Sequence, residues 1–81
     1  MALRNMTMAS TLARQLAQSQ YPTATIAEGM VLKSGRFFEL PVFITLPAKK
    51  QRGKKQKKPK RISRYVQVPV VVEGGPARWR E

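Results

Sequence analysis

The sequence contains no cysteine, no histidine and no aspartate, and only four glutamates among 81 residues. Without cysteine the chain can form no disulfide, no thiolate zinc site and no thiol nucleophile. Without histidine it lacks the commonest general base and the commonest metal ligand. The carboxylates of Glu28, Glu39, Glu73 and Glu81 lie in separate segments, so no pair is placed for acid–base catalysis. We expect a protein that is not an enzyme and that uses no metal, cofactor or small-molecule substrate.

Long apolar runs are also missing. The longest, residues 41–47 and 66–72, are about seven residues each, whereas a bilayer-spanning helix needs ~20. The basic part of the chain contains no aliphatic or aromatic residue that would insert beside its charges into an anionic lipid surface. The sequence therefore predicts neither a transmembrane segment nor a membrane partner.

What the chain has in excess is positive charge. It carries 16 Lys and Arg against four Glu, which gives a net charge of +12. Such a surplus repels itself in the isolated protein and attracts phosphate from a distance. The hydrophobic fraction of 42% is nevertheless too high for a fully disordered chain. The composition predicts one small folded unit whose partner is a polyanion.

The N-terminal segment has the period of an amphipathic helix. Met8, Leu12 and Leu16 recur every four residues, with small alanines beside them and polar residues on the opposite side. This pattern predicts a helix over residues 7–19 whose apolar stripe is centred on those three side chains. An isolated helix of ~13 residues is marginal in water, so we expect it to lie on another surface.

Both ends of this helix have stop signals. Asn5 or Thr7 can cap its start, and the Tyr21-Pro22 step ends it, because a residue before proline is pushed out of helical geometry. The region 1–23 also has arginines but no acid, a composition typical of organelle leader peptides. Two interpretations stay open: a helix retained in the mature protein, or a leader removed on import.

Downstream of the helix the apolar residues alternate with a period of two. The pattern predicts three strands near residues 24–32, 36–46 and 62–73. Lys33-Ser34-Gly35 and Gly74-Gly75-Pro76 supply turn residues after the first and third. The even-numbered positions form the predicted apolar face: Ile26, Met30, Leu32, Phe38, Leu40, Val42, Ile44, Leu46, Val66, Val68, Val70 and Val72.

Two prolines fall within these strands. Because proline cannot donate to a ladder, we expect Pro41 and Pro69 each at a sheet edge, at a bulge, or with the nitrogen pointing outward. The odd-numbered face is only half polar, and Phe37, Phe43 and Val71 on it would need covering. A meander that is regular throughout is therefore too simple.

These patterns together predict an α+β fold. We expect one short N-terminal amphipathic helix on a small three-stranded antiparallel β meander spanning residues 24–75, with a long basic loop (47–64) between its second and third strands and a C-terminal tail at 76–81. A core this thin is expected to depend partly on a partner for order. The alternative is that the strands complete their pairing on another chain.

The long loop holds the densest charge. Ten of the sixteen basic residues lie between positions 49 and 64, with no acid among them. Like charges this dense keep a free segment extended, so it would project from the end of the hairpin. A solvated loop without a partner and a nuclear-localisation signal are the alternatives. The candidate nucleic-acid-binding residues are Lys49, Lys50, Arg52, Lys54, Lys55, Lys57, Lys58, Lys60, Arg61 and Arg64.

The tail supplies a second, smaller candidate. Trp79 lies between Arg78 and Arg80, so its ring could stack on an exposed base while the arginines meet phosphates. The favoured alternative is that Trp79 folds back onto Phe37 or Phe43 or docks in a protein groove. Tyr65 poses the same question, and strand packing is the favoured interpretation there.

Seven of the ten basic residues in the loop are lysine, which neutralises phosphate without the planar fork that reads base edges. We expect a non-catalytic, structural nucleic-acid-binding protein, with RNA favoured over DNA and with other proteins of a large assembly as neighbours. The layout is similar to that of ribosomal proteins as a broad group, which implies a ribosomal or mitoribosomal subunit in the mitochondrial matrix or cytoplasm. The alternative is a virion-internal protein that condenses a genome beneath a capsid.

Overall fold

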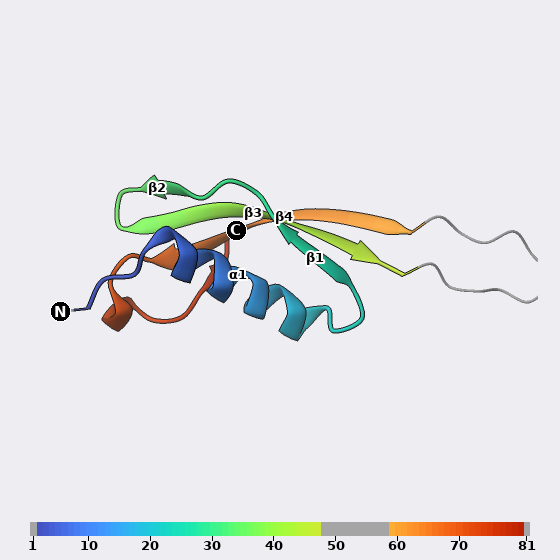
Figure 1. The fold of residues 1–81 in the computed structure, drawn as a ribbon, viewed down its shortest axis with the longest axis horizontal. Coiled ribbons are helices and arrows are strands. Elements are labelled where there is room, and N and C mark those ends of the chain that lie inside the picture. Colours follow the sequence, from blue (N-terminus) through green and yellow to red (C-terminus); the bar gives the residue numbers. More distant parts are fainter. Residues whose placement is uncertain (1, 48–58, 81) are drawn as a thin grey trace, which may run out of the picture.

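The computed structural model describes residues 2–47 and 59–80 and consists of one helix packed against one side of an antiparallel sheet (Figure 1). The strand order is β1-β3-β4-β5, and β2 pairs with β3 as well. The predicted α+β class is confirmed, but the sheet has five strands rather than three. The elements are α1 (Met6–Gln20), β1 (Thr25–Glu28), β2 (Leu32–Ser34), β3 (Phe37–Leu46), β4 (Lys60–Pro69), the 3₁₀ helix η1 (Val72–Gly74) and β5 (Arg78–Trp79).

Helix α1 extends one residue beyond each predicted bound, over Met6–Gln20 rather than 7–19. The side chain of Asn5 accepts a hydrogen bond of 2.9 Å from the backbone N–H of Met8, which caps the first turn. At the other end the N–H of Tyr21 donates to the carbonyl of Ala17.

In the part of the chain that the structure describes, α1 is the one α-helix, and it lacks the length and the apolar character of a membrane-spanning segment.

The buried stripe of α1 differs from the predicted one. Ala9, Ala13 and Ala17 are fully buried, whereas Leu12 and Leu16 pack at the margin of the core and Met8 is 44% exposed. Because alanine has no side chain beyond Cβ, it lets the helix backbone approach the sheet closely. The predicted stripe is therefore wrong by about one position around the helix.

Two strands share one edge of β3, with an interruption between them. β1 pairs up to Glu28↔Val42, and β2 resumes at Leu32↔Glu39. Residues 29–31 therefore oppose residues 40–41 of β3. One extra residue on one of two paired strands defines a β-bulge. The predicted strand over 24–32 is thus two short strands with a bulge at residues 29–31.

The bulge reverses the alternation of side chains, because one extra residue changes the face on which each following residue lies. Ile26, before it, is buried as predicted. After it, Val31 packs against the core, while Met30 and Leu32 are 78% and 61% exposed. The assignment of Met30 and Leu32 to the apolar face was therefore wrong.

The bulge also accommodates Pro41 in the central strand. The N–H of Gly29 donates to the carbonyl of Pro41 over 2.9 Å, so Pro41 faces the edge at the point where the regular ladder is interrupted. A Cβ atom on Gly29 would lie 2.5 Å from Cγ of the Pro41 ring. The missing side chain of Gly29 is what permits this close approach. The sequence allowed Pro41 at a sheet edge, at a bulge, or with its nitrogen pointing outward. The structure places it at a bulge, opposite residues 29–31.

Beyond Pro69 the chain leaves β4, earlier than the predicted end at residue 73. A bridge between Leu3 and Val71 joins this segment to the N-terminus, and the guanidinium of Arg4 donates to the carbonyls of Pro69 (3.0 Å) and Gly75 (2.8 Å). The chain then returns as β5, which pairs with Val66 and Gln67 of β4. Part of the expected C-terminal tail is therefore a strand.

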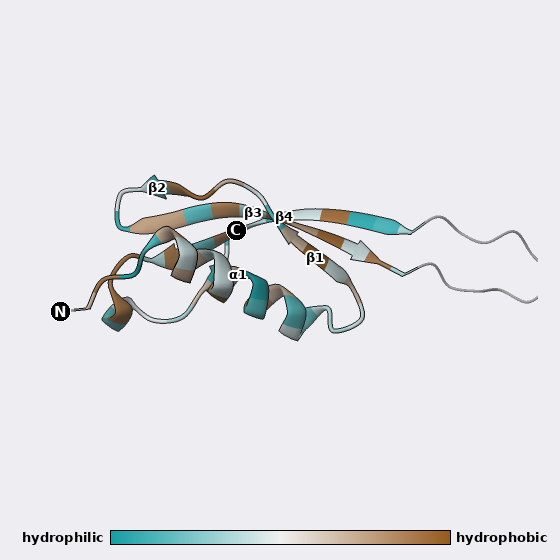
Figure 2. Ribbon diagram, in the orientation of Figure 1, coloured by the Kyte–Doolittle hydropathy of each residue, from teal (hydrophilic) through white to brown (hydrophobic). Residues whose placement is uncertain are grey.

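The core lies between α1 and the even-numbered side of β3 and β4. Figure 2 shows apolar and hydrophilic residues alternating along these strands. The predicted even-numbered face is thus confirmed where β3 and β4 pair. Its largest fully buried side chains, each at most 1% exposed, are Leu40, Val42, Ile44, Val66 and Val68.

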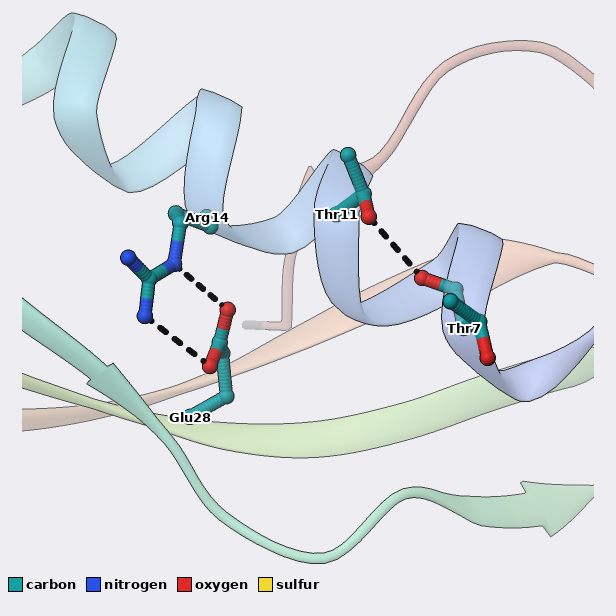
Figure 3. A network of polar contacts seen from close by, with 4 residues as sticks. All are labelled: Thr7, Thr11, Arg14 and Glu28. Atoms are coloured by element: carbon teal, nitrogen blue, oxygen red, sulfur yellow. Dashed lines mark hydrogen bonds and ion pairs between the residues drawn. The ribbon is translucent and has the colours of Figure 1, made fainter.

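An ion pair ties α1 to β1 across this packing (Figure 3). The guanidinium of Arg14 donates to both carboxylate oxygens of Glu28, at 2.7 and 3.2 Å. This hydrogen bonding with Arg14 holds the pKa of Glu28 below its ordinary value, although partial burial opposes the shift. The pair therefore favours the folded state while Glu28 is ionised.

Replacing Gly29 by alanine tests the close approach to Pro41. The added methyl group must displace a rigid ring, and overpacking of this kind costs about 1–3 kcal/mol. We expect Gly29→Ala to lower the midpoint of chemical denaturation. Gly35→Asn is the control, because Gly35 has φ +60° with nothing near its Cβ position and asparagine tolerates that backbone region. Equal stability of wild type and Gly29→Ala would contradict the bulge geometry.

The Arg14–Glu28 pair predicts a pH dependence of stability. A lowered native-state pKa contributes stability above the unfolded-state value of about 4.3, and this contribution is lost as the pH falls through the lowered pKa. We expect wild type to be modestly more stable than Glu28→Gln at neutral pH and the two to converge in acid. Denaturation midpoints measured across this range check it, and a constant difference at all pH values would argue against the ion pair.

Candidate nucleic-acid interface

The strands bring together the two sides of the basic segment, but the loop is shorter than the predicted 47–64, because residues 60–64 belong to β4. Seven of its candidate residues, from Lys49 to Lys58, lie outside the described residues. The last pair of the β3–β4 ladder is Leu46↔Lys60, so the segment between them leaves and re-enters the sheet at adjacent positions. The hairpin on which the sequence prediction depends is present.

The remaining six candidates divide between the two faces of the sheet. Directly paired residues of antiparallel strands point to the same face. Lys60 and Arg64 pair with Leu46 and Val42 of the helix side, and Trp79 pairs with Val66 of the same side. The other three, Arg61, Arg78 and Arg80, are therefore placed by the same alternation on the side away from α1.

Trp79 packs within the protein rather than standing free. The guanidinium carbon of Arg64 lies 4.2 Å from the centroid of the Trp79 ring, and Tyr21 meets the same ring edge-on at 6.4 Å. The indole N–H donates to the side chain of Gln20, and Arg64 donates to the Tyr21 hydroxyl over 3.4 Å. These contacts join β4 and β5 to the end of α1. Trp79 therefore folds back onto Arg64 and Tyr21 and not onto the expected Phe37 or Phe43.

We call the side of the sheet away from α1 the open face. Two large aromatic side chains are exposed on it: Phe43, 47% exposed, and Tyr65, 48% exposed. The face consists of Thr25 and Ala27 of β1, Leu32 and Ser34 of β2, Phe37, Glu39, Pro41, Phe43 and Thr45 of β3, Arg61, Ser63, Tyr65, Gln67 and Pro69 of β4, Arg78 of β5, and the adjacent Arg80.

A polar cluster lies beside Tyr65 on the open face. The guanidinium of Arg80 lies 3.6 Å from the carboxylate of Glu39, and its carbon lies 5.8 Å from the Tyr65 ring centroid. Gln67 donates to the other carboxylate oxygen of Glu39 over 3.0 Å. Glu39 thus holds Arg80 and Gln67 in place next to an exposed aromatic ring.

Two depressions lie along the two sides of the β4 strand. One, of about 310 Å³, is lined by residues that include Phe43, Arg61 and Ser63. The other, of about 380 Å³, is lined by Gln67, Arg78, Trp79 and Arg80. Arginine therefore lines both hollows, and an exposed aromatic ring, Phe43, lines the first.

Arginine side chains can bind anions, and exposed aromatic rings can stack on planar groups. Residues 2–47 and 59–80 contain no group of three or more potential metal-ligating side chains. Phe43 was not among the predicted site residues, because its sequence position indicated only an apolar residue that needed covering. The signal that could have found it is its place on the odd-numbered face together with Tyr65 and Arg61.

Comparison of the chain with protein-family models, with curated proteins and with solved structures finds no significant match. What the interface can bind therefore follows from its own charges, exposed rings and strand register.

Proposed function

We propose that the protein is a non-catalytic structural protein that binds nucleic acid by neutralising closely packed phosphates. The observation that carries this proposal is the concentration of ten of sixteen basic residues in positions 49–64, seven of which lie between the paired residues Leu46 and Lys60. The residues on both sides of this stretch are paired in the sheet. A basic loop held in this way can order on a polyanion at lower entropic cost than a free tail.

Two of the acids in the described residues, Glu28 and Glu39, are paired within the protein, which supports an external partner for the other basic residues. Glu28 is paired with Arg14, and Glu39 lies against Arg80 and Gln67. These carboxylates already have local partners, and the whole chain has only four glutamates for sixteen basic residues. The surplus charge is therefore available to anions of another molecule, and duplex DNA carries one phosphate charge per about 1.7 Å of its axis.

Lysine predominates in the segment, which favours binding that is indifferent to sequence. Phosphate neutralisation releases condensed counterions, so log K falls with log salt at about −0.9 per contact on duplex DNA and about −0.7 on single strands. Because Arg64 stacks on Trp79 within the fold, nine of the ten basic residues remain for phosphates. Nine contacts would give slopes of about −8 on duplex and about −6 on single strands. Phosphate contacts position a protein without reading bases, a property that suits structural support within a packed nucleic acid.

For the assembly, we propose a ribosomal or mitoribosomal subunit protein bound to RNA, in the mitochondrial matrix or cytoplasm. Exposed apolar side chains near the start of α1, including Leu3, Met6, Met8 and Val72, fit the neighbouring proteins of a large particle. The full burial of Ala9, Ala13 and Ala17 supports retention of the N-terminal helix. We expect RNase, and not DNase, to release the protein from its purified particle, because the polymer that it binds there is RNA. Release by DNase would instead favour a virion-internal genome-binding protein.

The phosphate mechanism predicts a change in salt dependence when lysines are removed. In Lys54→Gln combined with Lys55→Gln, two phosphate contacts are lost, so the slope of log K against log salt on a duplex becomes shallower by about 1.8. Fluorescence anisotropy with two unrelated duplex sequences measures it, and both sequences should weaken to a similar extent.

A matched control removes the same charge elsewhere. Lys33→Gln combined with Arg36→Gln also removes two positive charges, from exposed positions next to the β2–β3 turn. We expect the slope of this variant to stay close to that of wild type. Equal slopes for the two double variants, or a loss confined to one duplex sequence, would contradict the proposed mechanism.

A further inference from the structure

We infer that the open face binds unpaired bases of a single-stranded nucleic acid, which stack on Phe43 and Tyr65 while neighbouring arginines meet the phosphates. The inference rests on the proposed function, since it takes the polyanion to be nucleic acid. It adds a second mode of contact, because phosphate neutralisation alone needs neither exposed rings nor unpaired bases.

The register places the two rings as diagonal neighbours. Phe43 pairs with Ser63, and Tyr65 pairs with Pro41, so the rings stand on adjacent strands two residues apart along β4. Diagonal neighbours in an antiparallel pair are separated by about 7–8 Å. Antiparallel sheets that carry exposed aromatic rings on one face can stack two or three bases of a single strand.

Small neighbours keep the Phe43 ring accessible. Its cross-strand partners are Ala27 of β1 and Ser63 of β4, and neither side chain is long enough to cover it. Phe43 is 47% exposed as a result. Tyr65, whose partner on β3 is Pro41, is 48% exposed. A surface that only needed to be soluble would gain nothing from two bare rings on the same face.

Charge on the open face selects an anionic occupant. Among the described residues of this face, Arg61, Arg78 and Arg80 oppose a single carboxylate, that of Glu39, which Gln67 and Arg80 already contact. Two copies of the chain would bring like charges together if they docked through this face. Stacking between a base and an aromatic ring, flanked by arginine, suits a single strand instead.

The open face is continuous with the root of the basic segment. Arg61 follows Lys60, the first paired residue of β4, and lines the same depression as Phe43. The second depression, lined by Arg78 and Arg80, lies on the β5 side of the sheet. A single-stranded nucleic acid that is bound near Arg61 can therefore continue past Phe43 and Tyr65 to Arg78 and Arg80.

The experiment compares a polyanion that has bases with one that has none. Anisotropy competition measures binding of the full-length protein to a 12-nucleotide single strand, as RNA and as DNA, and to inorganic polyphosphate. We expect Phe43→Ala and Tyr65→Ala each to weaken single-strand binding by about 5- to 160-fold, the equivalent of ~1–3 kcal/mol per stacked base. Polyphosphate binding should stay unchanged, and Tyr65→Phe should keep wild-type affinity for the single strand.

The controls separate stacking from folding and from general apolar loss. Met8→Ala removes an apolar side chain of similar exposure, 44%, from α1, and should leave both affinities unchanged. Far-ultraviolet circular dichroism and a thermal melt of each variant confirm that it folds. If Phe43→Ala or Tyr65→Ala does not fold, Phe43→Leu and Tyr65→Leu keep apolar bulk without an aromatic ring and should show the same selective loss.

The outcomes distinguish this inference from the proposed function. Wild type that binds polyphosphate and single strands, with both affinities unchanged in the alanine variants, would overturn base stacking but leave phosphate neutralisation intact. Wild type that binds neither polymer at low salt would overturn both. The third outcome is that the alanine variants, sedimented without nucleic acid, have a smaller mass than wild type while their single-strand affinity is unchanged. It would show that the open face binds a second copy of the chain, and it would also overturn the inference.

Discussion

The pairing of β3 with β4 is the constraint on which the rest of the structure depends. Ten residues of each strand are in register, from Phe37↔Pro69 to Leu46↔Lys60. Because side chains alternate along both strands, this one register places Leu40, Val42 and Val66 under α1 and turns Phe43 and Tyr65 outward. A shift by one residue would exchange the two faces. The same pairing holds the ends of the basic segment together.

The register also gives arginine different roles at neighbouring positions. Arg64, on the helix side, stacks on Trp79 and donates to Tyr21, so its charge is used within the fold. Arg61 and Arg80 lie on the open face, Arg80 against Glu39 and close to Tyr65. Sequence position alone makes these residues equivalent members of a basic cluster. Strand alternation separates the arginines that stabilise the protein from those that are available to a phosphate.

Much of the fold could be predicted from local patterns, because caps and alternation act over a few residues. The Asn5 cap, the stop at Tyr21 and the even-numbered core of β3 and β4 are of this kind. The bulge at residues 29–31 could not be predicted, since it depends on Gly29 meeting Pro41 across the sheet. The short strand at Arg78–Trp79 depends on tertiary pairing in the same way. At the site, charge indicated the basic segment, but only the register revealed the exposed pair Phe43 and Tyr65.

The central claim is that the hairpin presents its basic segment and open face to nucleic acid. Ultraviolet crosslinking of the protein in its native complex, followed by mass spectrometry of the nucleotide-bearing peptides, tests this claim most directly. The account predicts nucleotide adducts within residues 49–64 and on peptides that contain Phe43 or Tyr65, with none on the peptide of α1. Adducts confined to α1, or a basic segment that crosslinks only to acidic side chains of another protein, would contradict it.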